Sequence, residues 1–131
     1  MARKSAPLFS EPYEAWEQEQ VFLWAFHMEP RHPVLALMQG SINGVRIRDW
    51  GALAKMKKQG LKKGFPDISL PVPRHGYNGL FIELKRVKTG TVSSEQKKIL
   101  AMLNDEGNYA IVCKGHNEAI DVLEWYIGVK G

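Results

Sequence analysis

The sequence predicts an α/β domain in which a mixed β-sheet is flanked by helices, with the elements in the order α-β-α-β-β-α-β-α. Segments with apolar residues at steps of three and four alternate with short apolar runs that are typical of strands. Two of these runs are separated by a stretch rich in Pro, Gly and Asn, which indicates a β-hairpin. A helix separates this hairpin from the next strand, and such a connection favours a mixed sheet covered on both sides.

Length and composition indicate one globular domain, which we place at residues 10–131 after a flexible basic lead-in at residues 1–9. Hydrophobic residues make up 44% of the chain and charged residues 24%, which excludes disordered, collagen-like and coiled-coil classes. The longest apolar run, residues 21–28, is too short to cross a bilayer. We therefore expect a soluble, intracellular (cytoplasmic) protein with no membrane partner.

The first half of the chain is predicted to contain two helices and a strand. Ser10 begins a helix over Tyr13–Met28, where apolar residues recur at helical spacing until prolines end it. The apolar run Val34–Met38 is interpreted as the first strand. Asp49 is a candidate N-cap for a helix over Trp50–Lys58, which ends before a glycine.

The second half begins with the hairpin, predicted over Asp67–Arg86. Ser93 and Gln96 then match a capping box that opens a helix reaching about Asp105. The run Tyr109–Cys113 is predicted to form a fully apolar, central strand.

The last predicted element is a helix over Asn117–Ile127. Its spacing indicates that Ile120, Leu123 and Trp125 are buried.

The hairpin carries charges within its apolar strands. Because side chains alternate along a strand, Glu83 and Lys85 should share one face while Ile82 and Leu84 share the other, and Asp67 lies on the preceding strand. Such charges are costly to bury unless they are paired, bound to metal or used in a reaction. An ordinary ion pair between Glu83 and Lys85, or Asp67 as a turn residue, is the simpler alternative.

Charge is distributed unevenly along a chain whose net charge is +4. Residues 11–29 contain five acids and no Lys or Arg, whereas residues 46–63 contain seven basic residues and a single acid. This asymmetry is expected if a polyanion binds close to a metal site. A solvated helix face whose lysines favour the helix C-terminus explains the basic segment equally well.

The charged hairpin and its surroundings resemble a known enzyme family. Pro66-Asp67 and Glu83-Leu84-Lys85 are similar to the motif of PD-(D/E)XK nucleases, which share a restriction-endonuclease-like core. More narrowly, the chain resembles a stand-alone virus-type replication-repair nuclease, or VRR-NUC, domain. The matching features, in chain order, are Glu14 with Gln18, Lys58-Gln59-Gly60, Gly64-Phe65-Pro66-Asp67, Glu83-Leu84-Lys85-Arg86 and Ser94-Glu95-Gln96.

The resemblance implies a site for Mg²⁺ or Mn²⁺, and both cations prefer oxygen ligands. The implied metal ligands are Glu14, Asp67, Glu83 and the backbone carbonyl of Leu84. Lys85 would orient the attacking water or stabilise developing charge, and Gln96 would position these groups. Glu17 and Glu19 remain alternatives to Glu14, because they lie near it in the same acidic run. The spacing of Glu14 to Gln18 and Trp24 resembles the family's first motif, although Ala15 stands where the family frequently has histidine.

The implied activity is a structure-selective DNA endonuclease that acts as a homodimer on four-way (Holliday) or other branched DNA, without a haem or nucleotide cofactor. A non-catalytic DNA-binding or assembly module and a restriction-type or end-acting nuclease remain alternatives. Residues expected to contact phosphates are Arg46, Arg48, Lys55, Lys57, Lys58, Lys62, Lys63 and Arg86.

Overall fold

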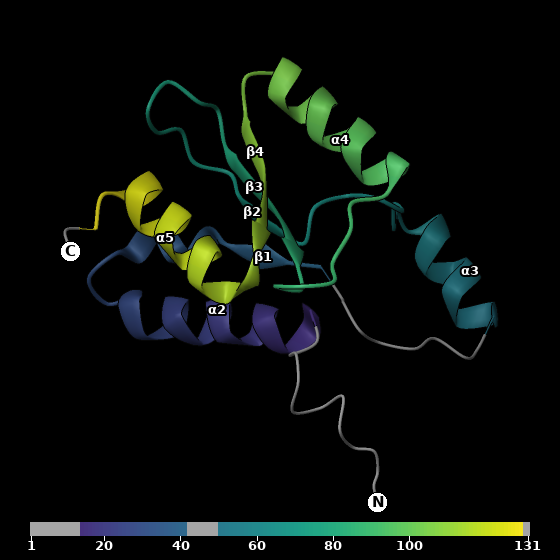
Figure 1. Ribbon diagram of the computed structural model, residues 1–131, viewed down its shortest axis with the longest axis horizontal. Coiled ribbons are helices and arrows are strands. Elements are labelled where there is room, and N and C mark those ends of the chain that lie inside the picture. Colours follow the sequence, from purple (N-terminus) through teal and green to yellow (C-terminus); the bar gives the residue numbers. More distant parts are fainter. Residues whose placement is uncertain (1–13, 42–49, 130–131) are drawn as a thin grey trace, which may run out of the picture.

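A mixed sheet organises the computed structural model, which describes residues 14–41 and 50–129 (Figure 1). The helix start at Ser10, the N-cap Asp49 and the DNA-contact candidates Arg46 and Arg48 lie outside the described residues. The elements are α2 (Glu14–Met28), the 3₁₀ helix η2 (Pro33–Leu37), β1 (Gln39–Gly40), α3 (Trp50–Lys58), β2 (Ile68–Leu70), β3 (Leu80–Lys85), α4 (Ser94–Asp105), β4 (Tyr109–Lys114) and α5 (Gly115–Ile127).

The sheet has the order β1-β2-β3-β4. The pairs β1–β2 and β2–β3 are antiparallel, whereas β3 and β4 run parallel. The predicted hairpin and the predicted mixed sheet are therefore confirmed. The prediction that Tyr109–Cys113 is central was wrong, because β4 is an edge strand and β3 lies inside the sheet. Helices α4 and α5 both pack on β4, which explains why an edge strand is apolar throughout.

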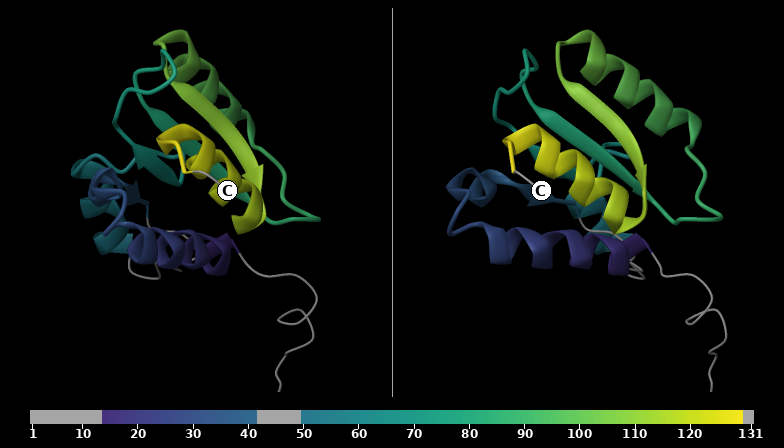
Figure 2. Two further views of the ribbon diagram at one scale, coloured as in Figure 1. Left: turned by 90° about the vertical axis from the view of Figure 1, so that its left-hand side faces the viewer. Right: turned by 60° about the vertical axis from the view of Figure 1, so that its left-hand side comes forward.

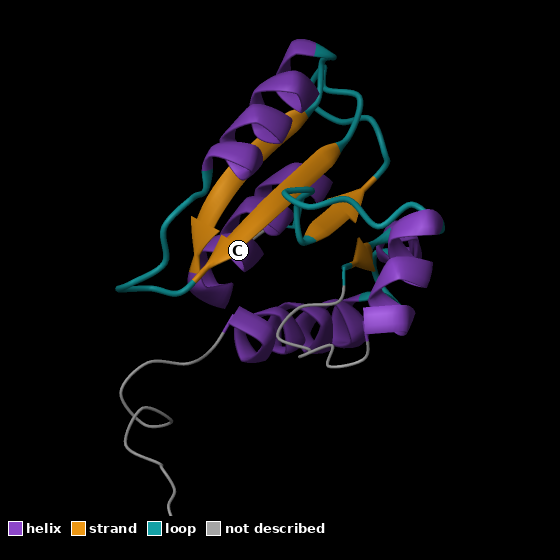
Figure 3. Ribbon diagram, turned by 90° about the vertical axis from the view of Figure 1, so that its right-hand side faces the viewer, coloured by secondary structure: helices purple, strands orange, loops and turns teal. Residues whose placement is uncertain are grey.

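Helices cover both faces of the sheet, as Figures 2 and 3 show. Helices α2 and α5 pack against each other and against β3, and α4 packs against β4 on the other face. The core between them includes the fully buried side chains of Leu84, Leu123 and Tyr126. Consequently β3 is buried along nearly its whole length, charged residues included. Within the described residues, no helix is long and apolar enough to cross a membrane.

The predicted strand at Val34–Met38 was wrong, because residues 33–37 form η2 and the first strand follows it. Pro33 lies in the first turn, where its fixed φ suits a helix and its missing N–H has no partner to lose. Leu35 and Met38 are the buried residues of this segment. Their spacing of three matches a 3₁₀ turn, not the alternation of a strand.

Helix α3 has the predicted bounds, yet none of its residues is buried. Figure 1 shows it standing apart from the sheet. Gly60, which follows it, has a φ of 107°, the left-handed conformation expected after a helix end. Helix α3 therefore presents its lysines to solvent and contributes little to the core.

Helix α5 starts two residues before the predicted Asn117, and its inward face differs from the prediction. Leu123 is buried as expected, but Ile120 is only partly covered and Trp125 is 45% exposed. Tyr126 takes the inward position instead, and its hydroxyl donates a 2.7 Å hydrogen bond to the Val72 carbonyl. The ring of Trp125 stacks on His75, with centroids 4.3 Å apart.

Candidate metal and catalytic site

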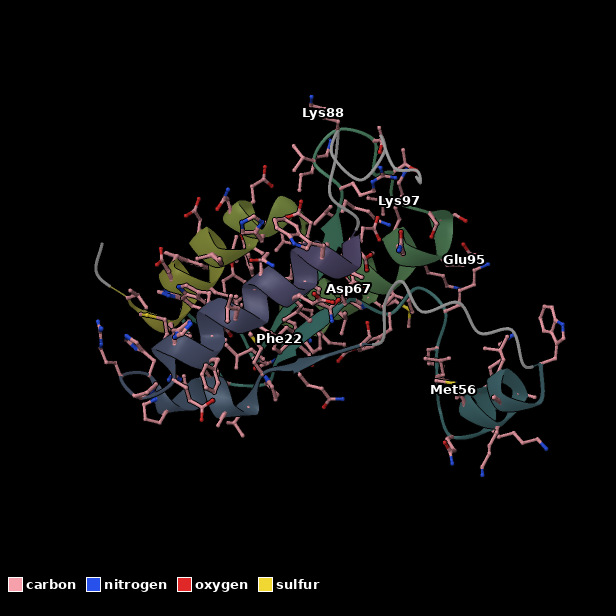
Figure 4. The ribbon with its side chains drawn as sticks, turned by 90° about the horizontal axis from the view of Figure 1, so that it is seen from below. Phe22, Met56, Asp67, Lys88, Glu95 and Lys97 are labelled. Carbon is pink, nitrogen blue, oxygen red and sulfur yellow. The ribbon has the colours of Figure 1, made fainter. Side chains whose placement is uncertain are left out.

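Two buried carboxyl groups face each other across β2 and β3. The register pairs Ile68 with Ile82, so one further step places Asp67 opposite Glu83 on the same face. Their exposed fractions are 5% and 1%. Asp67 Oδ2 accepts a 2.7 Å hydrogen bond from the backbone N–H of Leu84, which fixes its carboxylate against β3. Figure 4 shows Asp67 beside the first turns of α2.

Lys85 and Glu14 complete the charged cluster. Lys85 shares a strand face with Glu83, and its Nζ lies 3.5 Å from Glu83 Oε2. The same Nζ lies 4.0 Å from Glu14 Oε2, at the start of α2. Only 8% of the Lys85 side chain is exposed, so its ammonium group meets these two carboxyl groups with little solvent around it. The ammonium group therefore occupies a fixed position between an acid of the sheet and an acid of the helix.

Gln96 links the site to the start of α4. Its Oε1 accepts a 2.8 Å hydrogen bond from the Ser93 N–H, and its backbone N–H donates to Ser93 Oγ, so the predicted capping box is confirmed. Because the cap requires the amide oxygen, the amide nitrogen must point the other way, and it donates a 2.9 Å bond to Glu83 Oε2. The cap thus fixes the orientation of the group that holds Glu83.

The environment of the site favours the protonated forms of its acids. Burial, together with the charge of nearby Asp67, raises the pKa of Glu83 to about 8 from its ordinary 4.5. Burial also raises the pKa of Glu14, against the opposing effect of Lys85. Two carboxyl groups buried face to face cannot both be charged cheaply without a cation. The pair is therefore a site where a positive ion would be stabilised.

The donor set fits a small divalent cation. Glu83 Oε1 is buried and has no hydrogen-bond partner among the described residues, although buried carboxylate oxygens are normally satisfied. Within residues 14–41 and 50–129, no three acidic, His or Cys side chains enclose a metal on their own. Mg²⁺ commonly binds through one or two carboxylates and takes its other ligands from water and phosphate. Asp67 and Glu83 would hold such an ion, with the predicted Leu84 carbonyl beside them.

A hydrogen-bonded chain holds Asp67 from the side of β1. The Ser41 N–H donates a 2.8 Å bond to the Asp67 carbonyl, and the Ser41 carbonyl accepts a 2.8 Å bond from Gln18 Nε2. Gly40 allows this approach, because a Cβ there would lie 2.5 Å from the Gln18 amide nitrogen. Ser41 was missed by the sequence reasoning, which offers no signal for its register opposite Asp67. Gln18 therefore supports the site one helical turn beyond Glu14.

Asp67, one member of the acidic pair, lines a cleft of about 410 Å³. Gln96, Ser41 and residues of the loop over 60–65, including Lys62, line it too. A negatively charged substrate in the cleft would therefore have a lysine as well as an acid of the pair nearby.

The structure distinguishes the three acids of α2. Glu14 lies beside Lys85, Glu19 is exposed, and Glu17 is 2% exposed. Glu17 Oε1 accepts bonds of 2.7 Å and 2.6 Å from the backbone N–H and the Nδ1 of His116 on α5. Glu17 thus joins two helices, and Glu14 is the helix acid placed at the candidate metal site. Its role as a ligand stays a prediction.

The DNA-contact candidates within the described residues lie on α3, on the loop that follows it, and at Arg86. Lys55, Lys57 and Lys58 are exposed on α3. Lys62 and Lys63 lie on the following loop, and Lys63 Nζ is 3.8 Å from Glu95 Oε2 in an exposed ion pair. Arg86 is half-buried directly after Lys85. The loop lysines are therefore the candidates placed at or next to the cleft.

Comparisons with known proteins bear on the family and the fold. A family model described as the VRR-NUC domain matches residues 12–117. A solved structure described as "VRR_NUC domain protein" shares 29% sequence identity, covers 88% of each chain and superposes with a TM-score of 0.71. No curated protein sequence matches the chain.

In metal-free protein, Glu83 should make stability fall as pH rises. Between its ordinary pKa of 4.5 and about 8, the folded state binds a proton at Glu83 that the unfolded state releases. The free energy of unfolding should therefore decrease over this range, and Glu83→Gln should flatten that slope. Urea unfolding in EDTA from pH 5 to pH 8 measures it. The exposed Glu19→Gln variant is the matched control, and an equal slope in wild type and Glu83→Gln would contradict the assignment.

Gln96 should affect metal binding separately from helix capping. Ser93→Ala removes one cap hydrogen bond and should lower stability by about 1 kcal/mol with little change in Mn²⁺ affinity. Gln96→Ala removes the other cap hydrogen bond and also the donor to Glu83, so Mn²⁺ affinity should fall roughly 10- to 100-fold. Calorimetric titration with Mn²⁺ measures both variants. If the two lost affinity equally, capping alone would explain Gln96.

Proposed function

The chain belongs to the VRR-NUC domain family of nucleases, and from this premise we propose that it is a metal-dependent endonuclease that hydrolyses phosphodiester bonds in branched DNA. One observation carries the proposal. A buried pair of carboxyl groups lies beside a buried lysine, Glu83 Oε1 has no hydrogen-bond partner among the described residues, and Asp67 lines a cleft that also contains Lys62. A purely DNA-binding module would gain nothing from carboxylates close to phosphate.

Each residue of the site has a distinct part in the proposed reaction. Bound between Asp67 and Glu83, Mg²⁺ or Mn²⁺ would supply charge neutralisation at the phosphate and a lower pKa for the attacking water. Lys85 Nζ, fixed beside Glu83, orients that water and stabilises negative charge developing on the phosphate oxygens. Gln96 holds Glu83 in position through its amide nitrogen. Lys62 binds the phosphate backbone at the cleft wall.

Selectivity for branched DNA and a homodimeric state complete the proposal. Basic side chains on α3 and the loop contact the phosphate backbone, which carries shape and charge but no sequence information. A two-fold dimer would present two such clefts to a four-way junction, whose exchanging strands are themselves related by symmetry. Light scattering should give the mass of two chains. A monomer that still cuts junctions symmetrically would contradict the dimeric part of the proposal.

Loss of either an acid or the lysine should abolish cleavage. Asp67→Asn removes a carboxylate of the metal site, and Lys85→Ala removes the cation beside it, so each should lower the rate by at least roughly 100-fold. The measurement is cleavage of a four-way junction, a closed circular duplex and a linear duplex in Mg²⁺, with EDTA as the metal-free reference.

The matched control is Asp121→Asn, an exposed aspartate on α5 that should leave the rate unchanged. Persistent cleavage by either site variant would overturn the catalytic assignment. Cutting confined to DNA ends would instead identify an end-acting nuclease on the same fold.

The loop lysines should contribute to the salt dependence of DNA binding. Replacing Lys62 and Lys63 by Ala removes two candidate phosphate contacts, so the slope of log K against log salt should become shallower by about 0.9 per lost contact. Fluorescence anisotropy in EDTA measures binding without cleavage. The control is Arg74→Ala, at the opposite end of the hairpin, and an unchanged slope in the lysine variant would remove both residues from the interface.

A further inference from the structure

We propose that Phe65 is a stacking platform for an unpaired base next to the scissile phosphate, and that it thereby selects DNA in which a nucleotide can leave the base stack. The inference rests on the proposed nuclease function and adds a specificity residue to it. Phe65 lies two positions before Asp67 and lines the same cleft as Asp67 and Gln96. Its side chain is therefore placed to meet the nucleotide that the acidic pair would act on.

The exposure of Phe65 contrasts with its surroundings. Its exposed fraction is 43%, whereas the following residues Pro66, Asp67 and Ile68 are all buried. An exposed large apolar side chain that lines a cleft indicates a binding role more strongly than one on an open surface. Because the cleft also contains Lys62, it offers a bound nucleotide both an aromatic face and a cation for its phosphate.

The backbone on both sides of Phe65 is constrained. Gly64 has a φ of 87°, and a Cβ there would lie 3.0 Å from backbone and side-chain carbons of Glu95, so the loop packs tightly on the first turn of α4. On the other side, Pro66 has its φ fixed by its own ring. The Phe65 ring meets Phe81 of β3 edge to face, with centroids 5.9 Å apart at 90°. A ring held in this way loses little conformational entropy when a base stacks on it.

A fixed aromatic ring recognises the structure of the DNA and not its base sequence. Every base has a π-face, so stacking on an aromatic side chain tolerates any sequence. In an intact duplex the base is already stacked between its neighbours, and extruding it is costly. The cost is smallest where the nucleotide is unpaired or at a branch. Phe65 would therefore favour bulged, flapped or branched substrates over continuous duplex.

The test compares two labelled DNA duplexes of the same sequence, one of which carries an unpaired nucleotide at the cut position. Wild type in Mg²⁺ should cut the bulged duplex with the higher kcat/KM. Phe65→Leu keeps an apolar side chain but removes the π-face, so its kcat/KM on the bulged duplex should fall roughly 5- to 150-fold. Its kcat/KM on the continuous duplex should change little. Phe65→Tyr, which keeps the ring, should retain the preference.

Phe26→Leu is the matched control, because Phe26 is a more exposed phenylalanine, at 72%, near the end of α2. It should leave the preference unchanged. An equal loss on both duplexes by Phe65→Leu would show a purely structural role and overturn the inference. No wild-type preference for the bulge, or a preference that survives Phe65→Leu, would overturn it too.

A binding measurement separates this inference from the proposed nuclease function. The unpaired nucleotide is replaced by 2-aminopurine, and fluorescence is followed in EDTA, where no cleavage occurs. Wild type and Phe65→Tyr should quench the signal by stacking, whereas Phe65→Leu should bind without quenching. If wild type cuts no substrate, the nuclease proposal fails, and this quenching alone decides whether Phe65 stacks on DNA. Absence of quenching by wild type overturns the inference even if cleavage is found.

Discussion

Two carboxyl groups buried face to face, which cannot both be charged without a cation, impose the main constraint on this molecule. Asp67 and Glu83 are brought face to face by the β2–β3 register, and burial raises the pKa of Glu83 to about 8. A fold gains no stability from that arrangement, which a cation would relieve. Hydrogen bonds from the surrounding chain hold this unfavourable pair in place. The backbone N–H of Leu84 donates to Asp67, and the side chain of Gln96 donates to Glu83. Lys85 lies beside Glu83 and partly balances the negative charge.

The three layers of the fold each contribute to this pair. The sheet supplies its spacing, α2 supplies Glu14 and the Gln18 support of Ser41, and α4 supplies Gln96 from its first turn. Helix α5 fixes α2, because Glu17 accepts two bonds from His116. The loop before Asp67, packed on α4 through Gly64, brings Lys62 and Phe65 to the cleft. The sheet, α2, α4 and the loop before Asp67 therefore all contribute residues to one site.

Local signals in the sequence predicted much of this structure. Helical spacing located α2, and the capping box located α4, because both patterns lie within a few consecutive residues.

Long-range features were not predictable in the same way. The apolar run at Val34–Met38 is equally compatible with a strand and a 3₁₀ turn, and apolar β4 resembles a central strand because helices cover both its faces. The opposition of Asp67 and Glu83 depends on a register that the intervening loop does not specify. The sequence also could not show that Glu17 is bonded to His116, because that contact depends on α5, far away in sequence.

Asp67 and Glu83 are proposed to hold one divalent cation between them. Anomalous diffraction from a crystal soaked in Mn²⁺ locates the metal without reference to activity. We expect a peak between the two side chains, about 2 Å from a carboxylate oxygen of each, with Glu83 Oε1, which has no hydrogen-bond partner among the described residues, as one of these oxygens. Mn²⁺ bound elsewhere in the crystal, or not bound at all, would rule out this site.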